Sequence, residues 1–146
     1  MEGLVKWLSI GDRHTKMYLD RCLAPLGLNS SQHMYIPRIC DEPGIAQDRL
    51  ARLFRLHPSN VTRSLAALEK AGYLYREKDP GDKRTSRIYP TEKAREARPL
   101  VRQIVDRWQD LVLEPFTPEE REQLVSLLRR AAERAVALAE EREMTE

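Results

Sequence analysis

The stretch SNVTRSLAALEKAGYLYREKDPGDKRTSRIYP, residues 59–90, decides the fold of this 146-residue chain. Its apolar residues first recur at intervals of four and three, the spacing of one buried helical face: Val61, Leu65 and Leu68. Gly72 then ends the predicted helix as a left-handed cap. Two alternating segments, residues 73–78 and 86–90, enclose a Pro-Gly-Asp turn and predict a β-hairpin. A helix followed at once by a basic hairpin is typical of a winged helix-turn-helix.

A second helix is predicted directly upstream of this one. In IAQDRLARLF, residues 45–54, the apolar residues Leu50, Leu53 and Phe54 fall on one helical face. The segment RLHPSN, residues 55–60, is the kind of short break that joins two helices at a steep angle. We expect the winged helix-turn-helix to occupy residues 32–91, with an additional helix from Gln32 to about Cys40 that Asn29 or Ser30 would cap.

Long helices are predicted on both sides, at residues 1–28 and 92–146, within a single domain of residues 1–146. Gly11 is a weak point of the first helix. Pro99 should bend the helix that Thr91 caps, and Thr117 and Glu120 form a capping box for the last one. The fold class is therefore mainly α with a small β-hairpin wing.

The flanking helices carry more apolar surface than a winged module needs, so we predict that they form a homodimer. The expected interface residues are Leu4, Leu8, Ile104, Trp108, Leu111, Leu124, Leu128 and Ala131. Ile104, Trp108 and Leu111 belong to a short heptad seam that begins at Ala97 and Val101. The alternative is that this seam packs within its own chain.

Charge is unevenly distributed along the sequence. The chain has 25 Lys and Arg against 23 Asp and Glu, yet residues 47–98 have 13 against 7. A basic centre on a nearly neutral chain indicates a phosphate-contacting module, with a solvated charged face as the alternative. No apolar run approaches the roughly 20 residues of a membrane span, so a cytoplasmic protein without membrane contact is expected.

Cys22 and Cys40 lack the spacing of a zinc site or a disulfide framework, so no metal and no cofactor is predicted. The sequence also lacks a nucleophile elbow, a phosphate loop and a plausible carboxylate pair, which argues against an enzyme. A non-specific architectural DNA-binding or RNA-binding protein is the main alternative to a sequence-specific regulator.

In order, the segments GIAQDRLARLF, SNVTRSLAALEKAGYLYREKDPGDKRTSRIYPTEKA and FTPEEREQLVSLL resemble the MarR family (multiple antibiotic resistance regulators) over nearly the whole chain. The wing matches the family pattern most closely, at Asp79, Pro80, Asp82, Arg84 and Thr91. Pro90 and Ala94 stand where the family usually has Leu and Gly.

The resemblance implies a homodimeric transcription regulator, usually a repressor, that binds a pseudo-palindromic operator and is often released by a small phenolic or anionic ligand. It implies that Arg84 enters the minor groove and that Asp82 orients the wing through a salt bridge. The expected DNA-binding residues are Ser59, Asn60, Thr62, Arg63, Arg76, Lys83, Arg84 and Arg87.

Ligands in the family usually occupy a crevice between the dimerisation helices and the winged module. The candidates for this crevice are Trp7, His14, Arg21, His33 and Tyr35. The competing interpretation places Trp7 and Tyr35 in the core and the histidines on the surface. Redox sensing through Cys22 or Cys40 is a further alternative, although neither cysteine matches the position of the reactive cysteine in the peroxide-sensing branch.

Overall fold

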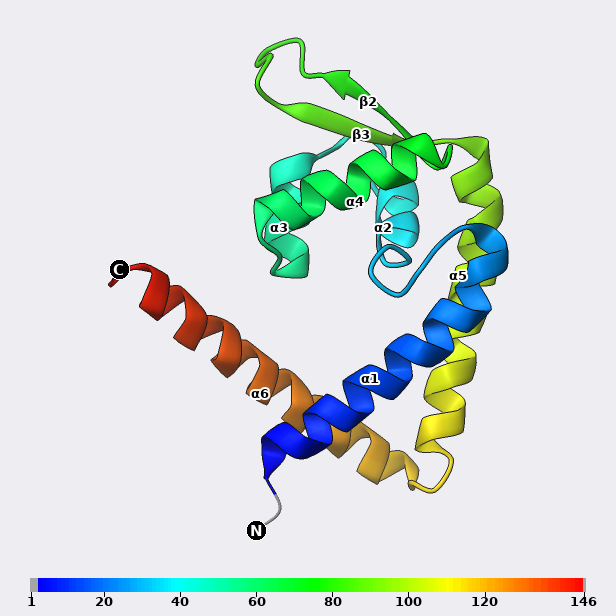
Figure 1. Cartoon of the computed structure of the whole chain (residues 1–146), viewed down its shortest axis with the longest axis vertical. Coiled ribbons are helices and arrows are strands. Elements are labelled where there is room, and N and C mark those ends of the chain that lie inside the picture. Colours follow the sequence, from blue (N-terminus) through cyan, green and yellow to red (C-terminus); the bar gives the residue numbers. More distant parts are fainter. Residues whose placement is uncertain (1–2, 146) are drawn as a thin grey trace. The chain divides into compact units, whose positions relative to one another are not determined.

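The computed structural model describes residues 3–145 as seven helices, one of them a short 3-10 turn, and three strands (Figure 1). The helices are α1 (Leu4–Leu23), η1 (Ala24–Leu26), α2 (Tyr35–Asp41), α3 (Gln47–Phe54), α4 (Pro58–Lys70), α5 (Glu92–Leu113) and α6 (Pro118–Glu143). The strands are β1 (Ile45–Ala46), β2 (Leu74–Lys78) and β3 (Ser86–Pro90). The chain forms two compact units, with the boundary inside α5. The first contains the elements from α1 to the part of α5 that ends at Trp108. The second contains the rest of α5, from Gln109, and α6.

The predicted helix-turn-helix and wing are confirmed. Helix α4 begins at Pro58, one residue earlier than expected, and directs a fully buried row into the core: Val61, Leu65 and Leu68. Gly72 follows it with a φ of 85°, which is the left-handed conformation predicted for its cap. Strands β2 and β3 then pair antiparallel from Leu74↔Pro90 to Lys78↔Ser86 and form the wing, residues 74–90.

The sequence did not predict β1, which adds a third strand to the sheet in the order β1-β3-β2. Ile45 pairs with Ile88, and both side chains are buried. Gly44, just before this strand, has a φ of 87° and donates its N–H to Ile88 O at 2.8 Å. The base of the wing is thus joined to the segment that leads into α3.

The expected start of α2 at Gln32 was wrong, because the helix begins at Tyr35. Asn29 does not cap it. Its Oδ1 instead accepts hydrogen bonds from the N–H and the hydroxyl of Ser31, at 2.9 and 2.7 Å. Such a local Asx turn competes with helix formation, which accounts for the later start. Helix α1, in contrast, continues through Gly11.

The first part of the predicted seam on α5 packs within its own chain. Ala97 and Val101 are buried, and Ile104 lies against the same core. Trp108 stacks on Tyr18 with ring centroids 4.5 Å apart, and its Nε1 donates to Thr15 Oγ1 at 3.0 Å. Ile104 therefore packs against the core of this unit and Trp108 contacts α1, while both remain half-buried and Leu111 is 39% exposed.

A charge at Ile104 should consequently destabilise the fold. We expect Ile104→Glu to lower the free energy of unfolding by about 1–3 kcal/mol, because the carboxylate would lie against apolar side chains. Gln103→Glu adds the same charge at an exposed position of α5 and should leave stability nearly unchanged. Thermal denaturation followed by circular dichroism measures both. Equal melting temperatures for the two variants would contradict the inward packing of Ile104.

Helix α6 has no buried residue, although its start is well defined. Thr117 Oγ1 accepts from the N–H of Glu120, and the Glu120 carboxylate accepts from the N–H of Thr117, which confirms the predicted capping box. Its apolar side chains Leu124, Leu127, Leu128 and Leu138 are each 40–57% exposed in the single chain. Across residues 3–145, no helix combines the length and the apolar character that a membrane span requires.

Candidate nucleic-acid interface and ligand cavity

The four DNA-binding residues predicted on α4 are all exposed in its first two turns: Ser59, Asn60, Thr62 and Arg63. They face away from the core because the opposite side of the helix carries the buried apolar row. The helix start is capped by His57, whose Nδ1 accepts from the N–H of Ser59 at 3.1 Å. Arg63 donates to the Asn60 carboxamide, so its guanidinium is held on this face.

An ion pair braces the wing at its neck, where the strands meet the tip, and it involves Asp79 rather than Asp82, for which the resemblance implied a salt bridge. Arg87 donates to Asp79 Oδ2 at 2.7 Å and to Gly44 O at 3.2 Å. This pairing with Arg87 holds the pKa of Asp79 below its usual value. Asp82 instead accepts from the backbone N–H of Arg84 at 3.0 Å and from the Thr85 hydroxyl at 3.2 Å. Asp82 therefore shapes the turn at the tip, whereas Asp79 holds the two strands together at the neck of the wing.

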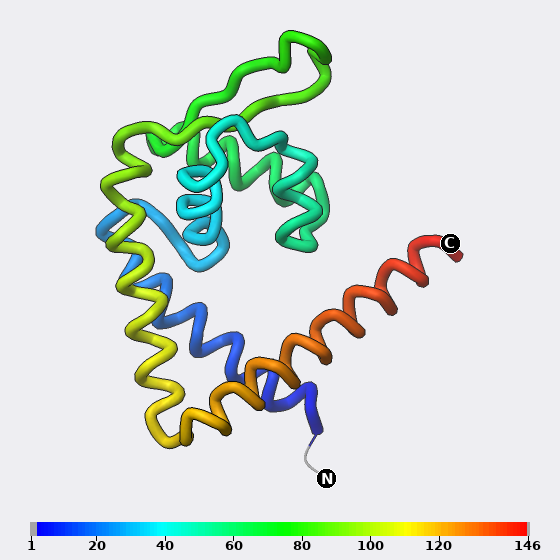
Figure 2. Tube along the Cα trace, turned by 180° about the vertical axis from the view of Figure 1, so that it is seen from behind, coloured from blue at the N-terminus to red at the C-terminus, as the bar shows by residue number. Residues whose placement is uncertain are grey.

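The four predicted wing cations fall into two groups. Arg76 pairs with Glu69 at 2.8 Å, and Arg87 pairs with Asp79. Lys83 and Arg84 are exposed near the tip and form no ion pair with any residue between 3 and 145. The tip points toward the same side as α3 and the start of α4 in both views (Figures 1 and 2). The start of α4 and the wing tip, which carries Lys83 and Arg84, thus lie on one side of this unit.

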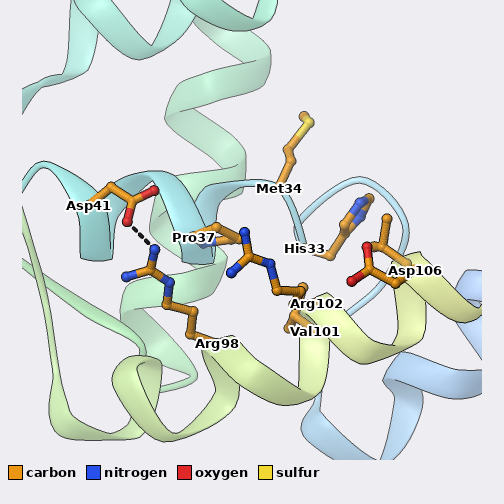
Figure 3. Close-up of a pocket in the computed structure, with 9 residues that line it drawn as sticks. His33, Met34, Pro37, Asp41, Arg98, Val101, Arg102 and Asp106 are labelled. Atoms are coloured by element: carbon orange, nitrogen blue, oxygen red, sulfur yellow. Dashed lines mark hydrogen bonds and ion pairs between the residues drawn. The ribbon is translucent and has the colours of Figure 1, made fainter. Parts of the chain in front are cut away.

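A cavity of about 310 Å³ lies between α2 and α5 (Figure 3). Its lining comprises His33, Met34, Pro37, Asp41, Arg98, Val101, Arg102, Val105 and Asp106. Arg98 and Arg102 rise from α5 toward α2, and Arg98 is paired with Asp41. Arg102 forms no ion pair within the described part of the chain. The cavity therefore combines apolar walls with one guanidinium, that of Arg102, and one carboxylate, that of Asp106, and neither forms an ion pair within the described residues.

Of the five predicted ligand residues, only His33 lines this cavity. Burial lowers the pKa of His33, and its Nδ1 lies 2.9 Å from Ser30 O, to which it must donate. Tyr35 does not line the cavity and is fully buried, edge-on to Phe54. Trp7 is 54% exposed, so neither a crevice nor the core encloses it in the single chain. His14 and Arg21 are exposed on α1.

Sequence reasoning missed the two arginines of the cavity. The signal was present, because Arg98 and Arg102 are four residues apart on α5 and flank the buried Val101. The spacing placed them on one face, but it did not indicate that α2 would lie opposite that face.

The cysteines and the acidic residues between 3 and 145 show no sign of a redox or metal site. Burial raises the pKa of the Cys40 thiol, which disfavours the thiolate that redox sensing requires. Cys22 is half-buried and is not bonded to Cys40. Within residues 3–145, no group of three or more His, Cys, Asp or Glu side chains is arranged to hold a metal ion.

Known proteins resemble this chain in sequence and in structure. The profile of the MarR family matches residues 28–86. The uncharacterized HTH-type transcriptional regulator YybA of Bacillus subtilis is 32% identical over 105 residues, which cover 72% of this chain and 70% of that protein. The crystal structure of MarR is 36% identical, covers 95% of both chains and superposes with a TM-score of 0.79.

The transcriptional repressor CouR, solved bound to a 23-mer DNA duplex, is 26% identical, with a TM-score of 0.81 over 90% of this chain and 93% of its own. The expectation that the chain is not an enzyme is confirmed, because the family consists of transcription regulators. These similarities, together with the winged helix-turn-helix, show that the chain belongs to the MarR family of transcriptional regulators.

Proposed function

We propose that this regulator is a homodimer that binds a pseudo-palindromic DNA operator, represses transcription there, and is released by a small anionic or phenolic ligand. DNA binding is supported by one observation: the start of α4, where the predicted DNA-binding residues are exposed, and the wing tip, which carries the unneutralised cations Lys83 and Arg84, lie on the same side of the unit. Polar side chains on a helix can hydrogen-bond base edges in the major groove. Cations at a wing tip suit the phosphates or the negative potential of a narrow minor groove.

A dimer with this surface would require two half-sites at a fixed spacing in the DNA. Two copies of α4 related by a two-fold axis must lie about 34–36 Å apart to enter successive major grooves on one face of the duplex. The operator should therefore be an inverted repeat with half-sites about one helical turn apart. The similarity to the repressor CouR, which was solved bound to a 23-mer DNA duplex, supports the binding of duplex DNA.

Selection of random duplex DNA by the purified protein, followed by sequencing of the bound pool, tests the proposal. We expect enrichment of an inverted repeat. Arg63→Ala should relax the preference at one base pair of each half-site, because the guanidinium held on the face of α4 can donate to guanine. A pool without a motif, bound with steep salt dependence, would favour the architectural alternative.

The ligand part of the proposal rests on the cavity between α2 and α5. A cavity of about 310 Å³ is large enough for a small aromatic acid, and the apolar side chains Met34, Val101 and Val105 would face its ring. Arg102, unpaired in the described chain, would meet the carboxylate. A ligand that binds one arrangement of the winged modules better than another by a few kcal/mol would suffice to release DNA.

The prediction for Arg102 uses benzoate as the probe. We expect Arg102→Gln to weaken benzoate binding about tenfold in titration calorimetry, because a charge-assisted hydrogen bond is lost from a partly enclosed site. Arg107→Gln removes an arginine from an exposed position of α5 that does not line the cavity, and it should bind benzoate like the unmodified protein. Equal affinity in both variants, or no benzoate binding at all, would contradict the proposed anion site.

A further inference from the structure

Gln47, the first residue of α3, is fixed against α4 by a hydrogen bond. Its Nε2 lies 2.9 Å from Thr62 Oγ1, which in turn lies 3.0 Å from Pro58 O. A hydroxyl has one proton, and a carbonyl oxygen can only accept, so Thr62 donates to Pro58 and must accept from Gln47. This assignment orients the Gln47 amide, with its nitrogen toward Thr62.

The Gln47 amide keeps one acceptor and one donor, which are the two groups that adenine can bond in the major groove. After the bond to Thr62, the amide retains Oε1 and one Nε2–H, and neither bonds to another side chain within residues 3–145. An acceptor and a donor side by side on a glutamine can bond N6 and N7 of adenine in the major groove. Thr62 has its hydroxyl engaged and presents its methyl group, which suits contact with the thymine methyl.

We propose that Gln47 reads an adenine in each half-site of the operator and that Thr62 is its positioning residue. The proposal rests on the sequence-specific DNA binding proposed above and extends the reading surface from α4 to the start of α3. Holding the amide before DNA arrives reduces the side-chain freedom lost on binding. A glutamine can also contact a phosphate, but such a contact carries no sequence information, and this difference makes the proposal testable.

The experiment compares bound pools selected from random duplex DNA by the full-length protein and its variants. For Gln47→Ala, we expect the preference for adenine at one position of each half-site to fall about tenfold, with the other positions unchanged. Thr62→Val removes the hydroxyl and keeps a methyl group, so it should weaken the preference at the same position. The control Gln103→Ala, at an exposed site on α5, should return the unmodified motif.

A substitution that exchanges the hydrogen-bond donor of Gln47 for an acceptor sharpens the test. Gln47→Glu replaces the amide donor with an acceptor, which cannot bond adenine N7 but can accept from cytosine N4. We expect the preferred base at that one position to change to cytosine. If Gln47→Ala proves unfolded by circular dichroism, the base preference selected by Thr62→Val tests the proposal instead, because that substitution leaves the core untouched.

The outcomes separate the two proposals. A motif selected by the unmodified protein and retained in full by Gln47→Ala would overturn the role of Gln47 alone. An equal loss of affinity on all sequences would also overturn it, since that result indicates a phosphate contact. If the unmodified protein itself selects no motif, the proposed sequence-specific function fails, and the base-reading role of Gln47 fails with it.

Discussion

Arg84→Ala is expected to weaken operator binding about tenfold and to reduce the slope of log affinity against log salt concentration by about one unit. The guanidinium is exposed at the wing tip and is not neutralised by any carboxylate in the described chain. Its full charge is therefore available to a phosphate or to the minor groove. Fluorescence anisotropy with labelled operator at several salt concentrations measures both quantities.

Arg13→Ala is the matched control for this measurement. It removes the same type of exposed side chain from α1 rather than from the wing. Its affinity should change little, and its salt slope should stay close to that of the unmodified protein. If Arg84→Ala gave the same affinity and slope as Arg13→Ala, the wing tip would have no part in DNA binding.

The second large effect is expected from Leu128→Glu on α6. Leu128 is 48% exposed in the single chain and belongs to the apolar stripe of a helix without any buried residue. If a second copy of the chain covers this stripe, the new carboxylate would be buried in the interface. We expect the dimer dissociation constant to rise about a hundredfold, equivalent to ~3 kcal/mol. Sedimentation equilibrium should then show monomers at micromolar concentration.

Ser126→Glu tests whether this effect is specific to the apolar stripe. It adds the same charge to the opposite side of α6, where the side chain is exposed, and the dimer should persist. Circular dichroism should show unchanged helix content in both variants. A dimer that survives Leu128→Glu would remove α6 from the proposed interface.

Local sequence signals predicted the central part of the fold well. The spacing of Val61, Leu65 and Leu68 identified the buried side of α4, and therefore also its outward face. The turn residues between β2 and β3 identified the wing, because Pro, Gly and Asp favour a reversal of the chain. These features depend on residues close together in sequence, and short-range preferences determine them.

Features that depend on distant partners were not predictable in the same way. Strand β1 is two residues long and exists because β3 pairs with it. The inward orientation of Ile104 depends on which apolar surface lies beside α5. Heptad spacing alone fits both packing within the chain and packing against a second copy. The cavity requires α2 and α5 to lie opposite each other. The salt bridge that the resemblance implied for Asp82 was likewise wrong, because Asp82 bonds within the turn and the ion pair of the wing joins Asp79 to Arg87, eight residues away across the hairpin.

The ion pair of Asp79 with Arg87 has a thermodynamic consequence for the wing. With Arg87 also bonded to Gly44 O, the neck of the hairpin is tied to the segment before β1, whereas the tip carries only the short-range bonds of Asp79 and Asp82. We therefore expect motion before binding to be concentrated in the few residues of the tip. The entropy lost when DNA orders the wing is limited to those residues, so more of the electrostatic attraction remains as net affinity.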